Sequence, residues 1–339
     1  MVERLEITGA TGLSTIAVGE SIKNLGKYIP ETRTVIITDG NVRALYGHDF
    51  PHCPVLEIGE GEKSKTLDTA SRLYGKLVDM GADRSCFILG IGGGIVCDVA
   101  GFVASTYMRG VDFGFCPTTL LAQVDASVGG KNGVNYQGYK NMVGVFNQPS
   151  FVVCDPAVLK TLPKHELASG FAEIVKHGAI RSWEHFSYLA NNVKKALALE
   201  PEVMGKLVFD SVSIKSQVVN EDEKEQGVRK ILNFGHTFGH AIETVGKIPH
   251  GHAVSVGMLV AANLSKKREM IQHEDVVRLE KLLTLLGLPT TVDVDRQKAI
   301  AALSKDKKKQ GDNIHFVLLK GIGEAVVEDI PVKELKIVI

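Results

Sequence analysis

The chain has 339 residues, of which 44% are hydrophobic and 23% are charged, a composition that is ordinary for a globular protein. Lysine plus arginine and aspartate plus glutamate both total 39, so the chain lacks the basic excess typical of nucleic-acid-binding proteins. Because one hydrophobic core rarely serves more than about 250–300 residues, this length predicts two domains.

The sequence predicts neither a membrane anchor nor a secretory signal. No apolar run approaches the roughly 20 residues that span a bilayer. The first residues alternate charged and apolar side chains, unlike the apolar segment of a signal peptide. The five cysteines show no CxxC spacing and mostly lie in apolar runs, which predicts buried, reduced thiols. We therefore expect a cytoplasmic protein.

The first ~155 residues have the alternating strands and helices of an open α/β sheet. Short β-branched or aromatic runs predict strands over 34–38, 55–58, 87–90, 113–115 and 151–154. Apolar residues at helical spacing predict helices over 67–80 and 95–105.

Helical periodicity dominates the rest of the chain. It predicts helices over 167–180, 184–197, 203–220, 231–245 and 253–269, and strands over only 315–319 and 324–327. Pro156 and Pro163 lie where the predicted pattern changes from alternating strands and helices to mostly helices. We therefore expect an α/β domain over 1–158 and a mostly α-helical domain over 159–339.

A run of glycines, Gly92-Gly93-Gly94, separates a predicted strand from a predicted helix. Such a turn lets backbone N–H groups approach a pyrophosphate at a helix N-terminus. The run is not a strict GxGxxG motif, so a tight turn without a ligand is the competing interpretation. Polar strings after two other strands, Asp39-Gly-Asn41 and Glu62-Lys-Ser-Lys65, favour a dinucleotide site.

Histidines and a glutamate in the second half have the spacing of metal ligands. His236 and His240 lie at i and i+4 on one helix face, and His250 follows. Glu173 lies upstream in a predicted helix. A catalytic zinc site needs three such ligands and an open position. Spacing alone suggests His236 and His240 as co-ligands and does not say which histidine is catalytic.

A long polar and glycine-rich segment over 117–135 is interpreted as a ligand-lining loop. Basic side chains distributed along the chain are suited to neutralising a phosphate or a carboxylate, with solvent exposure as the alternative. These side chains are Arg109, Lys131, Lys140, Lys215 and Arg229.

Taken together, the motifs resemble the 3-dehydroquinate synthase family of the sugar-phosphate cyclase superfamily, over about residues 39–308. The most specific strings are Gly92-Gly-Gly-x-x-x-Asp98, Pro117-Thr-Thr-Leu-Leu-Ala-Gln-Val-Asp-x-Ser-Val-Gly-Gly-Lys131, Asn233-Phe-Gly-His-Thr-Phe-Gly-His240 and His250-Gly-His-Ala-Val254. The family fold is an N-terminal Rossmann-like α/β domain followed by a mostly α-helical C-terminal domain, with the site in the cleft between them.

The resemblance implies a role for individual residues. Zinc or cobalt is held by Glu173, His236 and His250, while His240 contacts the substrate near its phosphate and takes part in proton movement. The other substrate-site residues are Arg109, Asp125, Lys131, Lys176, Lys215, Glu225, Arg229 and Asn233, together with one of Lys307 and Lys308. The NAD-contact positions are Asp39, Asn41, Glu62, Lys65, Gly93, Gly94, Asp98, Thr118, Thr119, Lys131, Lys140 and Asn141.

The resemblance also implies an activity of the shikimate pathway. Members of the family convert 3-deoxy-D-arabino-heptulosonate 7-phosphate to 3-dehydroquinate and phosphate. The steps are transient oxidation by NAD, β-elimination of phosphate, re-reduction and an intramolecular aldol closure, with a homodimer as the expected assembly.

Three rival functions are weighed against this one. Another sugar-phosphate cyclase, such as 2-deoxy-scyllo-inosose synthase or 2-epi-5-epi-valiolone synthase, uses a substrate without the carboxylate, and Lys215, Arg229 and Asn233 argue against it. A metal- and NAD-dependent polyol dehydrogenase does not need the segment that ends at Lys131. A catalytically silent NAD-binding regulator does not need the metal and lysine positions.

Overall fold

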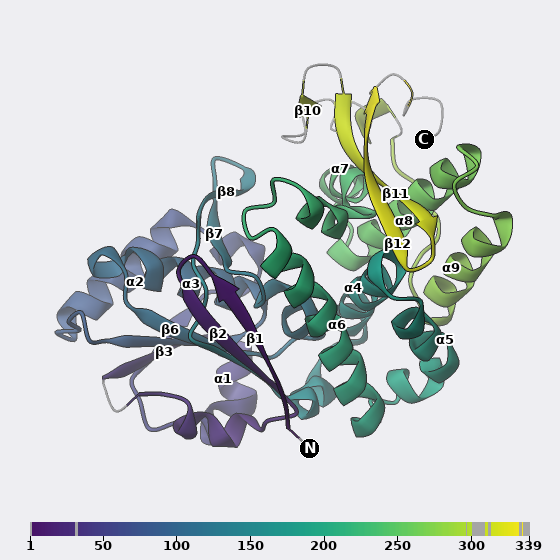
Figure 1. Ribbon diagram of the computed structural model, residues 1–339. Helices are drawn as coiled ribbons and strands as arrows, with labels where there is room; N and C mark the ends of the chain where they lie inside the picture. The colour runs from purple at the N-terminus through teal and green to yellow at the C-terminus, as the bar shows by residue number, and fades with distance from the viewer. Residues whose placement is uncertain are drawn as a thin grey trace. The chain divides into compact units, whose positions relative to one another are not determined.

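The computed structural model describes residues 2–30, 33–295, 297–299, 309–310, 313–331 and 334. The chain divides into two compact units, which we call unit 1 (Met1–Leu162) and unit 2 (Pro163–Ile339) (Figure 1). No helix in these described ranges is long and apolar enough to cross a membrane.

Unit 1 is built on a seven-stranded sheet with the order β1-β2-β9-β6-β5-β3-β4. Its strands are β1 (Glu3–Gly9), β2 (Gly12–Val18), β3 (Thr34–Asp39), β4 (Val55–Ile58), β5 (Phe87–Gly92), β6 (Asp112–Pro117) and β9 (Phe151–Cys154). The pairing of β1 with β2 is antiparallel and every other pairing in this sheet is parallel. The central strands β5 and β9 are buried throughout, because parallel sheets are covered on both faces.

Three helices cover the sheet of unit 1: α1 (Gly40–Tyr46), α2 (Leu67–Asp79) and α3 (Gly94–Thr106). Figure 1 shows α2 and α3 on one face and α1 on the other. On the α1 face, Ile22 and Leu25 of η1 (Ile22–Lys27) and Val158 of η6 (Pro156–Thr161) pack against the sheet. Shorter helical turns are η2 (Gly47–Asp49), η3 (Glu62–Ser64), η4 (Tyr107–Arg109) and η5 (Ala122–Ala126).

A separate two-stranded ribbon corrects the interpretation of residues 117–135 as a loop. This segment contains the π-helical turn η5 and the strand β7 (Lys131–Tyr136), which pairs with β8 (Tyr139–Phe146). The connecting residues Gln137 and Gly138 have φ values of 48° and 80°, as a tight hairpin turn requires. Glycine usually disfavours strands. Here Gly133 faces Gly144 across the ribbon, and a side chain on Gly133 would collide with the backbone of Val143, so glycine is needed at this position.

Unit 2 is mostly helical. Its helices are α4 (Lys164–Arg181), α5 (Trp183–Leu197), α6 (Pro201–Glu221), η7 (Val228–Asn233), α7 (His236–Gly246), α8 (His250–Lys267) and α9 (His273–Leu285). The strands β10 (Lys309–Gln310), β11 (Asn313–Gly321) and β12 (Glu324–Pro331) form an antiparallel sheet. Figure 1 shows β11 and β12 as a long hairpin.

One predicted helix of unit 2 is wrong. Residues 231–245 do not form a single helix, because the chain breaks between η7 and α7 at Gly235, whose φ is 78°. The left-handed backbone at this position favours glycine. The helix α9 and the N-terminal hairpin of β1 and β2 were not predicted, whereas the predicted fold class is confirmed.

Candidate functional site

The unit 1 site lies at the point where the sheet changes direction. From β3 the chain moves outward to β4, whereas from β5 it moves the other way to β6, and β3 and β5 are neighbours. In open α/β sheets, ligands bind outside the carboxyl ends of the strands at such a switch point. Asp39 ends β3 and Gly92 ends β5, so two predicted strings meet at this edge.

The glycine turn leaves the N-terminus of α3 open to an anion. Gly93 is the N-cap residue of α3, so no side chain caps the helix, and its first turn contains no acidic residue. The backbone N–H groups of a helix start, with the helix dipole, favour a phosphate there. The neighbouring strand is held close, since Thr118 donates its N–H to the carbonyl of Gly92 over 2.9 Å. An added Cβ on Gly93 would lie only 3.1 Å from Cγ2 of Thr119.

Asp39 caps a helix but lies where its negative charge is unfavourable. Its side chain caps α1 by accepting the N–H of Val42 over 2.9 Å. Burial, with help from the nearby Glu60 and Glu57 carboxylates, raises the pKa of Asp39. A carboxylate held in an environment that disfavours its charge is typical of a ligand-binding position.

Asn135 links several predicted cofactor residues, although the sequence indicated it only as the end of the segment over 117–135. Its Nδ2 donates to Oε1 of Glu62 over 2.8 Å, and its Oδ1 accepts the N–H of Asn141 over 2.9 Å. Its own N–H donates to the carbonyl of Lys65 over 2.8 Å, and Nζ of Lys65 pairs with the carboxylate of Asp98 on α3. The ribbon therefore ties the turn after β4 to α3.

The remaining predicted residues of unit 1 occupy different environments. Asn41, Lys131 and Lys140 are exposed and Asp125 is half-buried in η5. Arg109 is exposed in η4, after the last residue of α3, whereas the glycine turn precedes the first. The 13 residues of α3 span about 20 Å, so the chain does not bring Arg109 to the glycine turn.

In unit 2, three helices bring the predicted metal ligands together. Glu173 of α4, His236 at the start of α7 and His250 at the start of α8 have donor atoms within 4.8 Å of one another. Nε2 of His236 and Nε2 of His250 each lie 3.4 Å from Oε1 of Glu173. The Glu173 side chain is fully buried, whereas that of His250 is 28% exposed, so the cluster is reachable from the His250 side.

Close backbone packing places these ligands. A Cβ on Gly251 would overlap the Cα of Ser169, so α8 begins directly against α4. A Cβ on Gly257 would overlap the carbonyl of Gly235, so α8 also contacts the turn that precedes α7. Only residues without a side chain permit these approaches. Gly251 and Gly235 each lie next to a proposed ligand in the chain, and Gly257 lies further along α8.

The ionisable groups of the cluster are strongly coupled. Burial opposes ionisation of Glu173, but Lys176, His236 and His250 outweigh it and hold the pKa of Glu173 well below its usual range. Burial lowers the pKa of His236 despite the adjacent carboxylate. Burial also opposes protonation of His250, yet Glu173 and Glu243 raise the pKa of His250 to about 9.

The donor set fits a divalent metal of the zinc type. Nδ1 of His236 lies 3.1 Å from the carbonyl oxygen of Phe234, which only accepts hydrogen bonds, so Nδ1 carries the hydrogen. In the neutral ring, Nε2 then presents a lone pair toward Glu173. Oε2 of Glu173 pairs with the ammonium of Lys176, and its buried Oε1 faces Nε2 of both histidines. Two imidazoles and one carboxylate suit zinc or cobalt.

His240 and Glu243 extend the cluster along α7. The His240 ring centroid lies 5.3 Å from that of His236 and 6.1 Å from that of His250. Glu243, which the sequence did not indicate, lies with Oε2 3.3 Å from Nδ1 of His250. Its spacing of seven residues from His236 on one helix is the signal that could have found it.

Apart from His240, the predicted substrate residues of unit 2 that the structure describes lie on α4, α6, η7 and the turn between α6 and η7. Lys176 and Lys215 are buried, which is uncommon for lysine unless it serves a charge partner or a ligand. Arg229 is buried as well, and its Nη1 donates to the carbonyl of Glu223. Asn233 donates Nδ2 to Oε1 of Glu225 over 2.6 Å. Lys307 and Lys308 lie outside the described residues.

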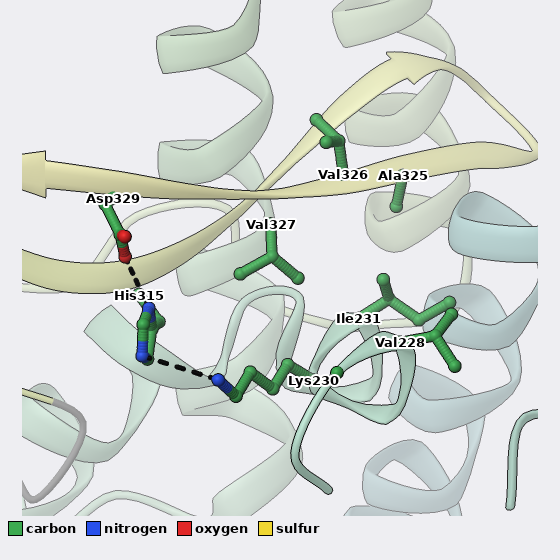
Figure 2. A pocket seen from close by; sticks show the side chains of 9 residues that line it. Val228, Lys230, Ile231, His315, Ala325, Val326, Val327 and Asp329 are labelled. Atoms are coloured by element: carbon green, nitrogen blue, oxygen red, sulfur yellow. Dashed lines mark hydrogen bonds and ion pairs between the residues drawn. The ribbon is translucent and has the colours of Figure 1, made fainter. Parts of the chain in front are cut away.

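A cavity of about 410 Å³ lies between η7 and the β11–β12 hairpin (Figure 2). In Figure 2, Lys230 of η7 reaches His315 of β11, with Nζ 3.4 Å from Nε2, and His315 in turn pairs with Asp329 of β12. The rest of the lining is mostly aliphatic: Val228, Ile231, Ala325, Val326 and Val327. None of the predicted site residues lines this cavity. The contacts from Lys230 to His315 and from His315 to Asp329 attach η7 to the β11–β12 hairpin.

Four of the five cysteines are buried. Cys86, Cys97, Cys116 and Cys154 are buried, Cys53 is half-buried, and all five are free. Burial raises the pKa of Cys97, Cys116 and Cys154, which makes these thiols unreactive. The prediction of buried, reduced thiols is confirmed for all but the half-buried Cys53.

Comparison with known proteins gives a consistent family assignment. The family models described as 3-dehydroquinate synthase N-terminal and C-terminal match residues 55–169 and 170–309. A 3-dehydroquinate synthase of Dehalococcoides mccartyi (strain CBDB1) is 43% identical over 323 residues, which cover 92% of this chain and 90% of that protein.

Two solved structures share the whole fold. A 2-deoxy-scyllo-inosose synthase complexed with carbaglucose-6-phosphate, NAD⁺ and Co²⁺ has a TM-score of 0.88 and 28% identity, covering 99% of both chains. The 2-epi-5-epi-valiolone synthase from Streptomyces hygroscopicus subsp. jinggangensis 5008, with NAD⁺ and Zn²⁺ bound, has a TM-score of 0.87 and 25% identity, covering 96% of this chain and 94% of that one.

Proposed function

The chain belongs to the 3-dehydroquinate synthase family, and on that premise we propose that it converts 3-deoxy-D-arabino-heptulosonate 7-phosphate to 3-dehydroquinate and phosphate. It is a cyclising enzyme that eliminates phosphate, and its cofactors are NAD and a divalent metal, zinc or cobalt. The observation that carries this proposal is the cluster of Glu173, His236 and His250 in a chain whose other half has an open helix start at a sheet switch point.

NAD supplies reversible hydride transfer, and the metal, held by Glu173, His236 and His250, acts as a Lewis acid on substrate oxygens. The proposed substrate carries a carboxylate and a phosphate, and the buried cations of unit 2 are suited to binding these anions. Arg229, which is preorganised by its contact with the Glu223 carbonyl, and Lys215 are suited to neutralising one of these anions.

His240 is the proposed proton carrier near the substrate phosphate. Its ring lies beside both proposed histidine ligands, which supports a role for this imidazole near the reacting oxygens without making it a ligand in this assignment. Asn233 and Glu225 form a hydrogen-bonded pair that we assign to orienting the substrate, with Lys176 supplying positive charge beside Glu173.

In unit 1 we propose that the α3 N-terminus at Gly93 and Gly94 binds the NAD pyrophosphate, with Asp39 accepting hydrogen bonds from a ribose. The other assigned cofactor positions are Asn41, Glu62, Lys65, Asp98, Thr118, Thr119, Lys131, Lys140 and Asn141. Arg109, Asp125 and Lys131 are assigned to the substrate.

We further propose a division of labour between an NAD-binding domain, ending close to residue 158, and a metal- and substrate-binding domain. The proposed assembly is a homodimer and the proposed location is the cytoplasm, both on the ground of family membership. The net charge of zero gives no support for a nucleic-acid partner.

The deciding experiment measures phosphate release from 3-deoxy-D-arabino-heptulosonate 7-phosphate with catalytic NAD⁺, with and without a chelator. We expect one dehydroquinate for each phosphate, no accumulation of NADH, and loss of activity on chelation. Activity only with hexose or heptulose phosphates that lack a carboxylate would identify another sugar-phosphate cyclase. NADH accumulation with simple polyols would identify a dehydrogenase.

A further inference from the structure

The two ring nitrogens of His250 face two different carboxylates. Nε2 lies 3.4 Å from Oε1 of Glu173, and Nδ1 lies 3.3 Å from Oε2 of Glu243. The Glu243 side chain is 13% exposed, so this contact is largely shielded from water. Because Glu243 belongs to α7 and His250 begins α8, the contact also joins the two helices that carry the histidine ligands.

The other histidine ligand has an equivalent arrangement made with the backbone. Nδ1 of His236 donates to the carbonyl of Phe234, and its Nε2 points to the same Glu173 oxygen that His250 approaches. A carboxylate, like a carbonyl, only accepts, so with Nε2 facing a metal shared with Glu173, Glu243 assigns the hydrogen of His250 to Nδ1. Both rings are thereby held with the Nε2 lone pair directed at the metal position.

We propose that Glu243 is a positioning residue that orients His250 and strengthens it as a metal ligand. This inference rests on the proposed metal site. The carboxylate fixes the tautomer of His250, and its negative charge increases the electron density at Nε2, which raises the affinity for a cation.

Glu243 also belongs to a second group of candidate ligands, with His240 and His250. The nitrogens of an imidazole diverge, however, and Glu243 lies on the Nδ1 side while Glu173 and His236 lie on the Nε2 side. Glu243 therefore cannot join Glu173 and His236 around one ion through His250. The geometry makes it a partner of the ligand rather than a ligand.

The test is Co²⁺ binding to chelator-stripped full-length protein, which is independent of catalysis. Affinity is measured by competition with a chelator of known strength, and the ligand set is read from the d–d absorption of bound Co²⁺. The variants are Glu243→Ala and Glu243→Gln. Glu173→Gln serves as the lost-ligand reference, and Asp210→Asn is the matched control, since Asp210 lies 3.6 Å from Nδ1 of the buried His185.

We expect Glu243→Ala to weaken Co²⁺ binding about 10–100-fold while the d–d spectrum at saturation keeps its wild-type form. Glu243→Gln keeps an acceptor oxygen for Nδ1 but loses the charge, so its loss should be smaller. Asp210→Asn should bind Co²⁺ like the wild type. If Glu243→Ala fails to fold, Glu243→Gln decides by the same criteria.

Three results overturn the inference. Affinity within twofold of the wild type in both variants means that Glu243 does not support His250. A d–d spectrum altered in the manner of Glu173→Gln means that Glu243 is itself a ligand. Failure of the wild type to bind Co²⁺ overturns the proposed metal site and this inference with it. Wild-type Co²⁺ binding without synthase activity contradicts only the proposed reaction.

Discussion

The two candidate sites are built in opposite ways. In unit 1, the site consists of backbone groups at the ends of neighbouring strands, with the turn at Gly93 and the uncapped start of α3 at its centre. In unit 2, the site consists of side chains from three helices, and Glu173 and His250 are 77 positions apart in the chain. The unit 1 site depends on the absence of a side chain at the glycine turn, whereas the unit 2 site depends on which helices pack together.

The comparison predicts that single side-chain changes affect the two sites very differently. Loss of one ligand removes one of three metal contacts. Loss of one side chain at the NAD site leaves the N–H groups of α3 in place. The following predictions run from the largest expected effect to the smallest.

Glu173→Gln should remove metal binding and activity together. The amide has the same shape but no charge, and it leaves the buried Lys176 ammonium without its carboxylate partner. Metal affinity should fall more than the roughly 100-fold upper range for loss of a group outside the ligand set, while NAD binding persists. Metal content and NAD titration check this, with Glu166→Gln on the exposed start of α4 as the control. Retained metal would contradict the ligand assignment.

Gly251→Ala should weaken the metal site without touching a ligand. The added methyl group overlaps the Cα of Ser169, so the first turn of α8, with His250, must move. Overpacking of this kind costs typically about 1–3 kcal/mol of stability, and metal affinity should fall with it. Gly205→Ala on α6 is the matched control, because its Cβ meets nothing within 4 Å. Equal unfolding midpoints and metal affinities for the two variants would show that this approach does not place His250.

Asp39→Asn should weaken NAD binding and change its pH dependence. A hydrogen bond to a charged group contributes about 1.5–3 kcal/mol, so affinity should fall about 10–100-fold, while the α1 cap is retained by asparagine. Because burial raises the pKa of Asp39, the wild type should lose affinity on acidification at a higher pH than an exposed aspartate would allow. NAD titrations across pH check both effects.

The sign of the accompanying stability change follows from the same shift. A carboxyl group whose pKa is raised on folding destabilises the folded state once pH exceeds its unfolded value, and the loss is complete above the folded value. Asp39→Asn should therefore raise the unfolding midpoint at neutral pH and leave it unchanged in acid. An unchanged midpoint at both pH values would mean that the Asp39 charge is well solvated.

Asn135→Ala should have the smallest effect. It removes the side-chain hydrogen bonds to Glu62 and to the N–H of Asn141, each worth about 1 kcal/mol, but leaves the backbone bond to Lys65. NAD affinity should fall only a few-fold, with metal affinity unchanged. A loss as large as that of Asp39→Asn would mean that the ribbon, rather than the strand ends, organises the NAD site.

The elements of unit 1 were largely predictable, because their signals are local. The β-branched runs that form β3, β4 and β9, and the helical spacing of α2, were sufficient to locate these elements. The hairpin of β7 and β8 was missed because its glycines suggest a loop. These glycines are compatible with a strand because the ribbon packs closely against α3, where Gly101 leaves room for Asn132. Only the tertiary structure shows this packing.

The sequence by itself determined the fold class and the family and predicted the residue types of both candidate sites, since glycine turns, histidine spacing and long ordered motifs are properties of the chain alone. The tertiary structure decided which groups meet. It brought His250, which the family resemblance implies, rather than His240, which spacing alone suggests, into the cluster with Glu173 and His236, and it revealed contacts of Glu243 and Asn135 with these sites. The reason is physical: these contacts depend on the close approach of α4, α7 and α8 and of the ribbon to its neighbours, which residue spacing does not encode.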